Sequence, residues 1–305
     1  MIENIKGNEK AIHILNRYVE KGFNANLTLH GPKGVGKYTA ARKVASDILN
    51  CTDNQLDIHP DAMIVSQTEA IKVEVVSRIL EFSSLLPVRG KNKVIIIDNA
   101  ETMSELVQNK LLKIVEENKT NIFIFVTSKP LLGTIHSRTF NVQFTSLTED
   151  ELNEYLKDKK EVPELPLSIY GGSVGRYELL KGGDNSDFAS IVKGIINTLQ
   201  TMNKKHEILA AFYELKEKDK NEFYSTHKVN ADLVISFIKE VFFDLYMLKT
   251  TGRKSNSINL SRLNALYSLE ETEKIYKQAK EHQHLCKDVR YTKNDFFMLI
   301  ALMAM

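Results

Sequence analysis

The first half of the chain alternates short apolar runs with longer segments in which apolar residues recur at helical spacing. Four runs have the length of strands: Leu27 to Leu29, Ala62 to Val65, Val94 to Ile97 and Ile122 to Val126. Continuous apolar strands separated by helices are typical of a parallel sheet that is covered on both faces. The pattern therefore predicts an α/β domain with a doubly wound parallel sheet.

The second half contains few of the residues that interrupt helices. Thirteen of the 14 glycines and all six prolines precede position 200. Beyond that position apolar residues recur at helical spacing, as from Phe237 to Leu245. We therefore predict an all-α domain at the C-terminal end.

A transition zone lies between these halves. Thr148 and Glu151 match a capping box, which predicts a helix start directly after the strand-like run Val142 to Phe144. Gly171 and Gly172 then precede a second short helical segment, Val174 to Leu180. We predict three domains, with boundaries at 1–147, 148–187 and 188–305.

Composition and charge narrow the class of protein. Lys and Arg number 41 against 39 Asp and Glu, a net charge of +2, which disfavours a module that binds nucleic acid mainly by neutralising phosphates. Cys51 and Cys286 cannot form a disulfide framework, and the N-terminal residues lack the apolar core of a secretion signal. No apolar run reaches membrane-spanning length. We expect a cytoplasmic protein without a membrane segment.

The strongest chemical signal is the run from Gly31 to Lys37, GPKGVGK, between a predicted strand and the predicted helix Ala40 to Leu49. This is the setting of a phosphate-binding P-loop. Gly31, Gly34 and Gly36 would let backbone N–H groups wrap a phosphate chain, and Lys37 would supply a positive charge. We therefore expect these four residues to line a nucleotide site.

Two residues of this site differ from those of an active P-loop ATPase. Tyr38 occupies the position of the Ser or Thr hydroxyl that ligates Mg²⁺, and Thr39 lies about 100° further around the helix. Asp98 ends an apolar strand, where it can hold metal-bound water, but Asn99 follows where a Glu base is expected. Glu101, on the next helix, is predicted to be solvated. We expect weak Mg²⁺ binding and weak or absent hydrolysis.

Three further segments carry a family resemblance: Gln108 to Glu117, Ile122 to Ser128, and Leu132 to Thr139. Together with the P-loop, they resemble the bacterial clamp-loader AAA+ subunits, within which the delta-prime group of DNA polymerase III is most similar. The resemblance implies a P-loop AAA+ domain with a parallel sheet, then a small helical lid and an all-α C-terminal collar that oligomerises.

The resemblance also implies roles for single residues. Ser137-Arg138-Thr139 is similar to the Ser-Arg-Cys motif, whose arginine acts on ATP held by a neighbouring subunit. An isolated Arg138 would otherwise form an ordinary surface ion pair. Thr127 and Ser128 fall at the sensor-1 end of a strand, although a hydroxyl there would serve equally to cap a turn. Arg176, in the segment that begins at Gly172, corresponds to the phosphate contact of sensor 2.

The implied function is that of a clamp-loader subunit within the replicative DNA polymerase III holoenzyme. Its partners would be the tau/gamma and delta subunits, the sliding clamp, and primed DNA within the complex. Cys51 and His59 are too few to form the four-cysteine zinc module of some relatives, so no zinc is expected. Whether the loop still binds ATP is left open. The alternatives are an ATP-hydrolysing tau/gamma-like motor, or a DNA-binding adaptor with a vestigial P-loop.

Two other clusters have ordinary explanations. His282, His284 and Cys286 are spaced so that only two of them share a helix face, which is too few for a metal site. The basic cluster of Arg89, Lys91 and Lys93 is most simply a solvated turn, with DNA in an assembly as the alternative.

Overall fold

A computed structural model shows how these segments fold. It describes residues 5–66, 71, 73–117, 120–163, 167–181, 194, 197–199, 201–210, 228–252, 260–285 and 293–305. Their packing forms two units, one of residues 1–159 and 172–175, the other of residues 160–171 and 176–305. The predicted three-domain boundaries stay a prediction.

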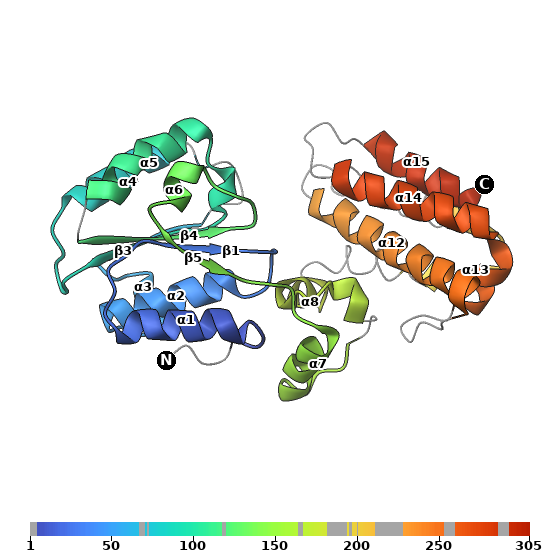
Figure 1. The fold of residues 1–305 in the computed structure, drawn as a ribbon, viewed down its shortest axis with the longest axis horizontal. Coiled ribbons are helices and arrows are strands. Elements are labelled where there is room, and N and C mark those ends of the chain that lie inside the picture. The colour runs from blue at the N-terminus through green and yellow to red at the C-terminus, as the bar shows by residue number, and fades with distance from the viewer. Residues whose placement is uncertain are drawn as a thin grey trace. The chain divides into compact units, whose positions relative to one another are not determined.

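The first unit is built on a five-stranded parallel sheet with the order β2-β3-β4-β1-β5 (Figure 1). The strands are β1 (Leu27–His30), β2 (Ala62–Val65), β3 (Lys93–Ile97), β4 (Asn121–Thr127) and β5 (Phe140–Gln143). The α/β fold class with a parallel sheet is therefore confirmed. Since β1 lies between β4 and β5, the segment that follows it, Gly31 to Lys37, leaves the sheet from an inner strand.

Helices cover both faces of this sheet (Figure 1). One face carries α1 (Glu9–Glu20), α2 (Lys37–Leu49) and α3 (Asp53–Leu56), and the other carries α4 (Val73–Ser84), α5 (Glu105–Glu117) and α6 (Gly133–His136). A short 3-10 turn, η1 (Ala100–Thr102), joins β3 to α5.

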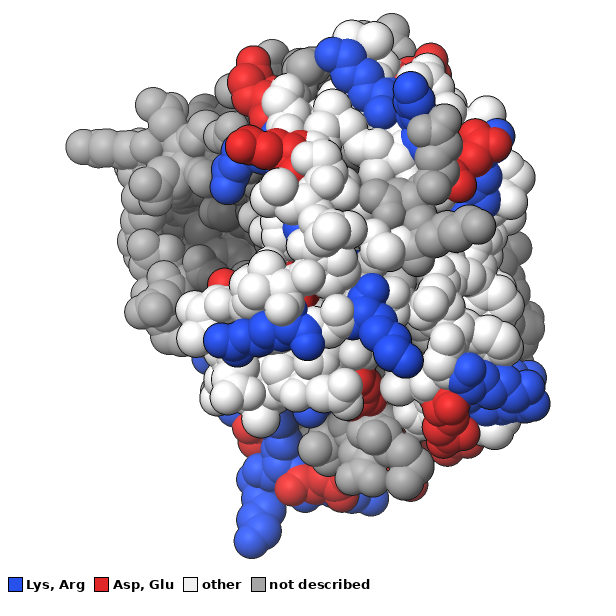
Figure 2. Space-filling model, turned by 90° about the vertical axis from the view of Figure 1, so that its left-hand side faces the viewer, with Lys and Arg blue, Asp and Glu red and all other residues white. Residues whose placement is uncertain are grey.

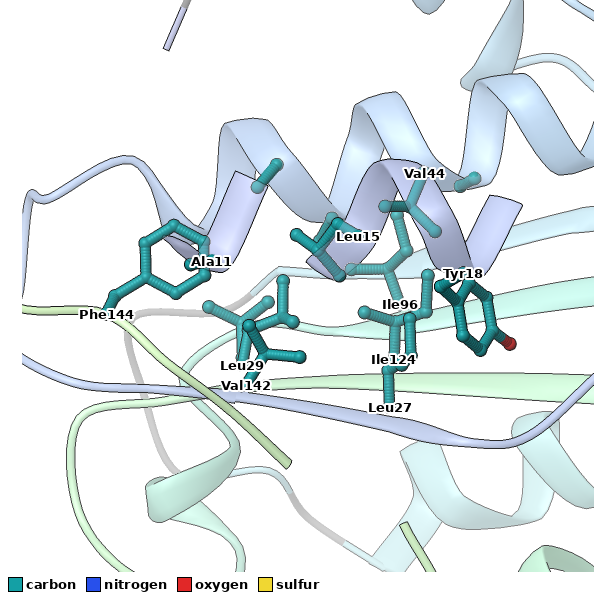
Figure 3. Close-up of a cluster of buried hydrophobic side chains, with 14 of the residues drawn as sticks. Ala11, Leu15, Tyr18, Leu27, Leu29, Val44, Ile96, Ile124, Val142 and Phe144 are labelled. Atoms are coloured by element: carbon teal, nitrogen blue, oxygen red, sulfur yellow. The ribbon is translucent and has the colours of Figure 1, made fainter. Parts of the chain in front are cut away.

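Alternate side chains of each strand enter two separate cores. From β4, Ile122 and Ile124 pack with α1 and α2, where Leu15 and Val44 are fully buried (Figure 3). The intervening Phe123 and Phe125 pack on the other face, with their rings stacked at 6.0 Å. Because both faces are buried, β4 is apolar at consecutive positions, as its sequence indicated.

The capping box predicted after the sheet is present. Helix α7 (Glu149–Asp158) begins after Thr148, whose Oγ1 accepts a hydrogen bond from the Glu151 N–H at 3.2 Å. The Glu151 carboxylate in turn accepts the Thr148 N–H at 2.7 Å. This reciprocal pair satisfies two N–H groups at the start of the helix.

The second unit is helical in its described residues, as predicted. Its elements are η2 (Leu167–Tyr170), the end of α8 (Val174–Lys181), α12 (Lys228–Thr251), α13 (Ser261–Leu266), α14 (Leu269–Leu285) and α15 (Lys293–Ala304). The Phe242 ring on α12 packs edge-on against Tyr267, with centroids 5.0 Å apart. The Tyr267 hydroxyl donates to the carbonyl of Met303 at 2.6 Å, which ties α15 to this core.

Buried charges order the connection between α4 and β3. Asp61 is fully buried and accepts the N–H groups of Val88 at 2.6 Å and Arg89 at 2.7 Å. Lys93, expected in a solvated turn, is instead buried, and its Nζ donates to the carbonyls of Phe82 and Leu85 at the end of α4. The expectation for Lys93 was wrong because carbonyls at a helix end provide a partner for a buried ammonium group.

Asp61→Ala tests this buried anchor. Burial raises the pKa of Asp61, but hydrogen bonds from the Val88, Arg89 and Gly90 amides lower it by more. The net pKa of Asp61 is therefore below its ordinary value. The carboxylate therefore stabilises the fold above pH 4, and this contribution is lost as the pH falls through the depressed pKa. We expect the substitution to lower the free energy of unfolding by about 2 kcal/mol at pH 7, because amide groups lose their acceptor.

Urea unfolding at pH 7 and pH 3 measures this effect. The difference between Asp61→Ala and wild type should shrink at pH 3. Asp158→Asn is the control, because Asp158 is exposed and pairs with Lys6 at the surface, where about 0–1 kcal/mol is expected. An equal loss in both variants would contradict the assigned role of Asp61.

Candidate functional site

The predicted P-loop lies at the carboxyl end of β1 and leads into α2, with Gly36 at the N-cap in the left-handed region at φ 93°. The Gly31 N–H donates to the carbonyl of Thr127 at 3.2 Å, which joins the loop to the end of β4. A Cβ atom on Gly31 would lie 2.1 Å from the Phe144 carbonyl oxygen. Glycine is therefore required at 31 by close packing against the chain that follows β5.

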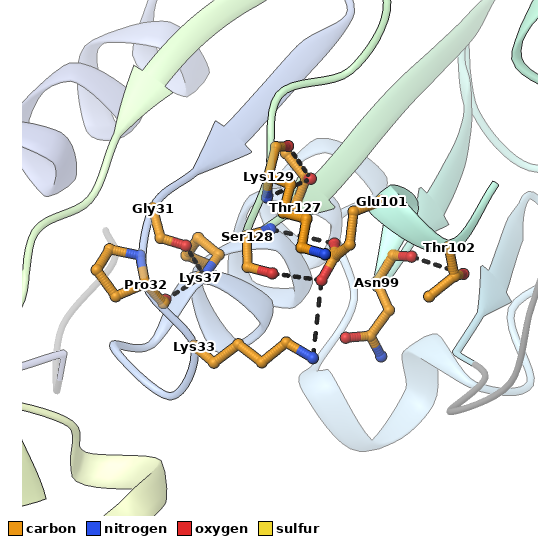
Figure 4. Close-up of polar contacts among 10 residues, drawn as sticks. All are labelled: Gly31, Pro32, Lys33, Lys37, Asn99, Glu101, Thr102, Thr127, Ser128 and Lys129. Atoms are coloured by element: carbon orange, nitrogen blue, oxygen red, sulfur yellow. Dashed lines mark hydrogen bonds and ion pairs between the residues drawn. The ribbon is translucent and has the colours of Figure 1, made fainter. Parts of the chain in front are cut away.

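Lys37 points back into this loop (Figure 4). Its Nζ donates to the carbonyl of Gly31 at 2.7 Å and to that of Pro32, and the residue is only 5% exposed. Burial lowers the pKa of Lys37 to about 8, although the charges of Glu101 and Asp98 act in the opposite direction. The ammonium group is thus held in place by the carbonyls of its own loop.

The glycine-rich segment at the start of α8 packs on the same loop. The Gly175 N–H donates to the Gly34 carbonyl at 2.8 Å, and the Ser173 hydroxyl donates to the Lys33 carbonyl at 3.1 Å. A Cβ atom on Gly34 would lie 2.2 Å from the Ser173 hydroxyl oxygen. Gly34 is therefore needed for contact with this segment as well as for any approach of phosphate.

The side chain of Tyr38 lies beside Arg42. The Arg42 guanidinium lies over its ring at 5.9 Å, and Arg42 Nη1 is 3.5 Å from the Tyr38 hydroxyl. Arg42 itself is fixed by the carboxylates of Asp53 and Asp57, each at 2.8 Å. Thr39 is exposed, whereas Lys37 on the same helix is buried. Tyr38 is half-buried, so it and Thr39 differ in their surroundings.

Asp98 follows β3 at the same edge of the sheet. Its carboxylate accepts a hydrogen bond from the Ser66 hydroxyl at 3.3 Å. Burial raises the pKa of Asp98, and the nearby Glu101 charge raises it further. Asn99 adopts a left-handed conformation, φ 51°, and its carbonyl accepts from the Thr102 hydroxyl at 2.8 Å. The chain therefore turns sharply directly after the acid.

Glu101 is not solvated as expected, because its side chain is only 8% exposed. Its carboxylate accepts from the N–H of Ser128 at 3.1 Å and from the Ser128 hydroxyl, and the Lys33 Nζ lies 3.8 Å away (Figure 4). Burial raises the pKa of Glu101, but the bonds from Ser128 and the Lys33 charge outweigh it, so the net pKa is lowered.

The error about Glu101 has a local cause. Residues 100–102 form a 3-10 turn after the left-handed Asn99 rather than the first turn of α5. The direction of the Glu101 side chain therefore cannot be inferred from its place on an α-helix. The hydroxyl of Ser128 at the end of the neighbouring strand was the available sequence signal. Parallel strands β3 and β4 end at one edge of the sheet, where an acid and a hydroxyl can meet.

The two candidate sensor residues have different surroundings. The Thr127 hydroxyl donates to the Lys129 carbonyl at 2.5 Å and accepts the Lys129 N–H at 3.2 Å, which is the turn-capping arrangement. Arg176 belongs to the second unit, where its guanidinium lies close above Gly171. Phosphate contacts by Thr127 and Arg176 stay predictions.

Arg138 lies at the opposite edge of the sheet from the P-loop. It lies two residues before the start of β5, which pairs in register with β1 from Leu27 ↔ Phe140 to His30 ↔ Gln143. The P-loop follows His30, so the length of β1, about 10–13 Å, separates the two positions. The Arg138 side chain is 35% exposed and pairs with Glu116 at 3.3 Å.

The cysteine and histidine candidates have structural surroundings. Cys51 is half-buried against the α1–α2 core, and His59 Nδ1 accepts the Asp61 N–H at 3.1 Å. His282 is buried on α14, while Cys286 lies outside the described residues. In the part of the chain that the structure describes, no three acidic, His or Cys side chains gather as a metal site, and no helix is long and apolar enough to cross a membrane.

Comparisons with known proteins agree with this architecture. The sequence profile of the family described as DNA polymerase III, delta subunit, matches residues 7–148. The replication factor C small subunit of Methanothermobacter thermautotrophicus is 29% identical over 167 residues, 53% of this chain and 51% of that protein. The replication factor C subunit 2 of Arabidopsis thaliana is 27% identical over 154 residues, 50% of this chain and 46% of that protein. The chain thus spans about half the length of these relatives.

A solved structure extends the likeness in fold to nearly the whole chain. The DNA polymerase III gamma subunit-related protein of Thermotoga maritima has a TM-score of 0.59 and 16% identity, and the match covers 96% of this chain and 98% of that one. The chain therefore shares the fold of that protein, and part of its sequence is similar to the DNA polymerase III delta subunit family and to replication factor C subunits.

Lys37→Met tests the buried ammonium group. The pKa of Lys37 in the fold, about 8, is below its ordinary 10.5, so the charged form opposes folding at pH 7. This cost falls as the pH rises through 8 toward 10. We expect wild type to gain about 1–3 kcal/mol of stability relative to Lys37→Met between pH 7 and pH 10.

Unfolding midpoints in urea at pH 7 and pH 10 give this difference. Lys33→Met is the matched control, because the Lys33 side chain is 67% exposed in the same loop. Its stability difference from wild type should change little over this range. A stability difference between Lys37→Met and wild type that is independent of pH would contradict the lowered pKa of the buried Lys37 ammonium group.

Proposed function

We propose that this chain is a delta-prime-type subunit of a bacterial clamp loader, in which Arg138 acts on ATP held by a neighbouring tau/gamma subunit. One observation carries the proposal: the sheet register separates Arg138 from the chain's own P-loop. This separation supports a role for Arg138 at a site on another subunit rather than at its own.

The chemistry of a guanidinium group suits this role. An arginine supplied by a neighbour stabilises the charge that develops on the transferred γ-phosphoryl group and can accelerate the reaction by about 10³ or more. Its planar set of N–H donors also matches the oxygens of a phosphate. Arg138 needs only partial exposure to present these donors to a partner.

The chain's own nucleotide site supports assigning hydrolysis to the neighbour. The Tyr38 hydroxyl lies beside the Arg42 cation, which is an unfavourable place for Mg²⁺. Asn99 cannot accept a proton, and the Glu101 carboxylate is already bonded to Ser128. We propose that the site holds magnesium poorly and that ATP, if it binds through Gly31, Gly34, Gly36 and Lys37, is not turned over.

The remaining parts of the proposal follow from the same assignment. The helical C-terminal unit would join tau/gamma and delta subunits in a cytoplasmic ring. ATP bound by these neighbours would favour the assembly that opens the sliding clamp, and primed DNA would trigger hydrolysis and release. No zinc is required by this role.

An ATP-hydrolysing motor subunit is the second candidate. The observation in its favour is the P-loop itself, with Lys37 in place between β1 and α2. A DNA-binding adaptor is less well supported. On the face drawn in Figure 2, basic and acidic side chains are interspersed around a largely uncharged area, which does not resemble a continuous phosphate-binding surface.

The purified chain should not hydrolyse ATP above background in the presence of Mg²⁺. The physical reason is the position of Tyr38 and the commitment of Glu101 to Ser128. Phosphate release by wild type and Lys37→Ala measures this. Turnover that is abolished by Lys37→Ala would instead support the motor candidate.

Arg138→Ala tests the role in trans within a complex reconstituted from all loader subunits. The complex should still assemble, while its DNA- and clamp-stimulated ATPase should fall to the turnover of sites that do not receive this arginine. Arg17→Ala, on the exposed side of α1, is the control and should keep full activity. Unchanged ATPase in Arg138→Ala would remove this residue from the mechanism.

A further inference from the structure

Arg138 is held by its own chain on two sides. Its Nη1 donates to the carbonyl of Thr134 at 3.1 Å, one helical turn earlier in α6. Its Nη2 lies 3.3 Å from Glu116 Oε2, near the end of α5. A carboxylate thus occupies a position on the guanidinium group where an incoming phosphate oxygen would bind.

The backbone around Arg138 leaves the side chain as the movable part. The Ser137 N–H donates to the Gly133 carbonyl and the Arg138 N–H to the Ile135 carbonyl, both at 3.0 Å. The next residue, Thr139, accepts a hydrogen bond from the Thr28 hydroxyl at 2.8 Å. These contacts fix the segment to α6 and to β1, so that exchange of partners involves the guanidinium group alone.

The ion pair with Glu116 is suited to exchange. Its side chains are 35% and 58% exposed, and Arg138 Nη2 and Glu116 Oε2 are 3.3 Å apart. Exposed pairs of this kind correspond to about 1.5- to 5-fold in an equilibrium constant. A terminal phosphate carries more charge and more acceptor oxygens than one carboxylate, so it can displace Glu116.

We propose that Glu116 is a positioning residue that holds Arg138 on its own subunit until a neighbour's γ-phosphate replaces the carboxylate. The inference rests on the proposed function of Arg138 in trans. Glu116 then competes with the nucleotide for the Arg138 guanidinium group. This competition raises the ATP concentration that is needed for Arg138 to bind at the neighbour's site. It acts on the binding of ATP rather than on the chemical step, because the pair is already broken once the phosphate is engaged.

The test is Glu116→Gln in the full reconstituted complex. The ATP concentration for half-maximal DNA-stimulated ATPase should fall by about 1.5- to 5-fold, with kcat unchanged. Glu105→Gln is the matched control, since it removes the same charge from the exposed first turn of the same helix. It should leave both parameters at the wild-type value, and the melting temperature should be unaltered in both variants.

A double variant separates this effect from a general change of charge. In the Arg138→Ala background, Glu116→Gln should leave the half-saturating ATP concentration unchanged, because the coupled partner is missing. A fall of the same size in that background, or in Glu105→Gln, would overturn the inference. So would an unchanged or raised half-saturating concentration in Glu116→Gln alone.

The outcomes also distinguish the two levels of the argument. If Arg138→Ala leaves the stimulated ATPase unchanged, the proposed function fails and the inference fails with it. If Arg138→Ala lowers the ATPase but Glu116→Gln behaves as wild type, only the role of Glu116 is refuted.

Discussion

The parallel pairing of β1 with β5 is the constraint on which the functional architecture depends. Because both strands run in the same direction, the end of β1 and the start of β5 lie at opposite edges of the sheet. The P-loop leaves one edge and the Arg138 segment enters the other, where Thr28 bonds to Thr139. An antiparallel pair would bring these two segments to the same edge.

Internal contacts occupy much of the P-loop. Lys37 donates to carbonyls of its own loop, and the carbonyls of Lys33 and Gly34 accept from the segment at Ser173 and Gly175. These bonds make the loop a junction between the sheet and the start of α8. Glycines in such a loop therefore have a packing role that is independent of nucleotide, as the close approach of Gly31 to Phe144 illustrates.

The sequence predicted the elements that depend on local pattern. Strands such as β3 and β4 are apolar on both faces, and the Thr148 capping box needs only residues three positions apart. The sequence-based predictions for Glu101 and Lys93 were wrong, because the surroundings of these two residues depend on partners distant in the chain. Ser128 is 27 residues from Glu101, and the carbonyls that receive the Lys93 ammonium belong to the end of α4.

Hydrophobic periodicity, glycine placement and the GPKGVGK run determined by themselves the α/β class, the helical second half and the position of the P-loop. The residue types at Tyr38 and Asn99 also indicated two differences from an active P-loop ATPase, because residue type alone defines whether a side chain can ligate Mg²⁺ or accept a proton. Only the tertiary structure decided which charges are committed internally. The pairing of Arg138 with Glu116 and of Glu101 with Ser128 depends on how separate strands and helices pack. No local sequence pattern encodes which of these side chains come within bonding distance.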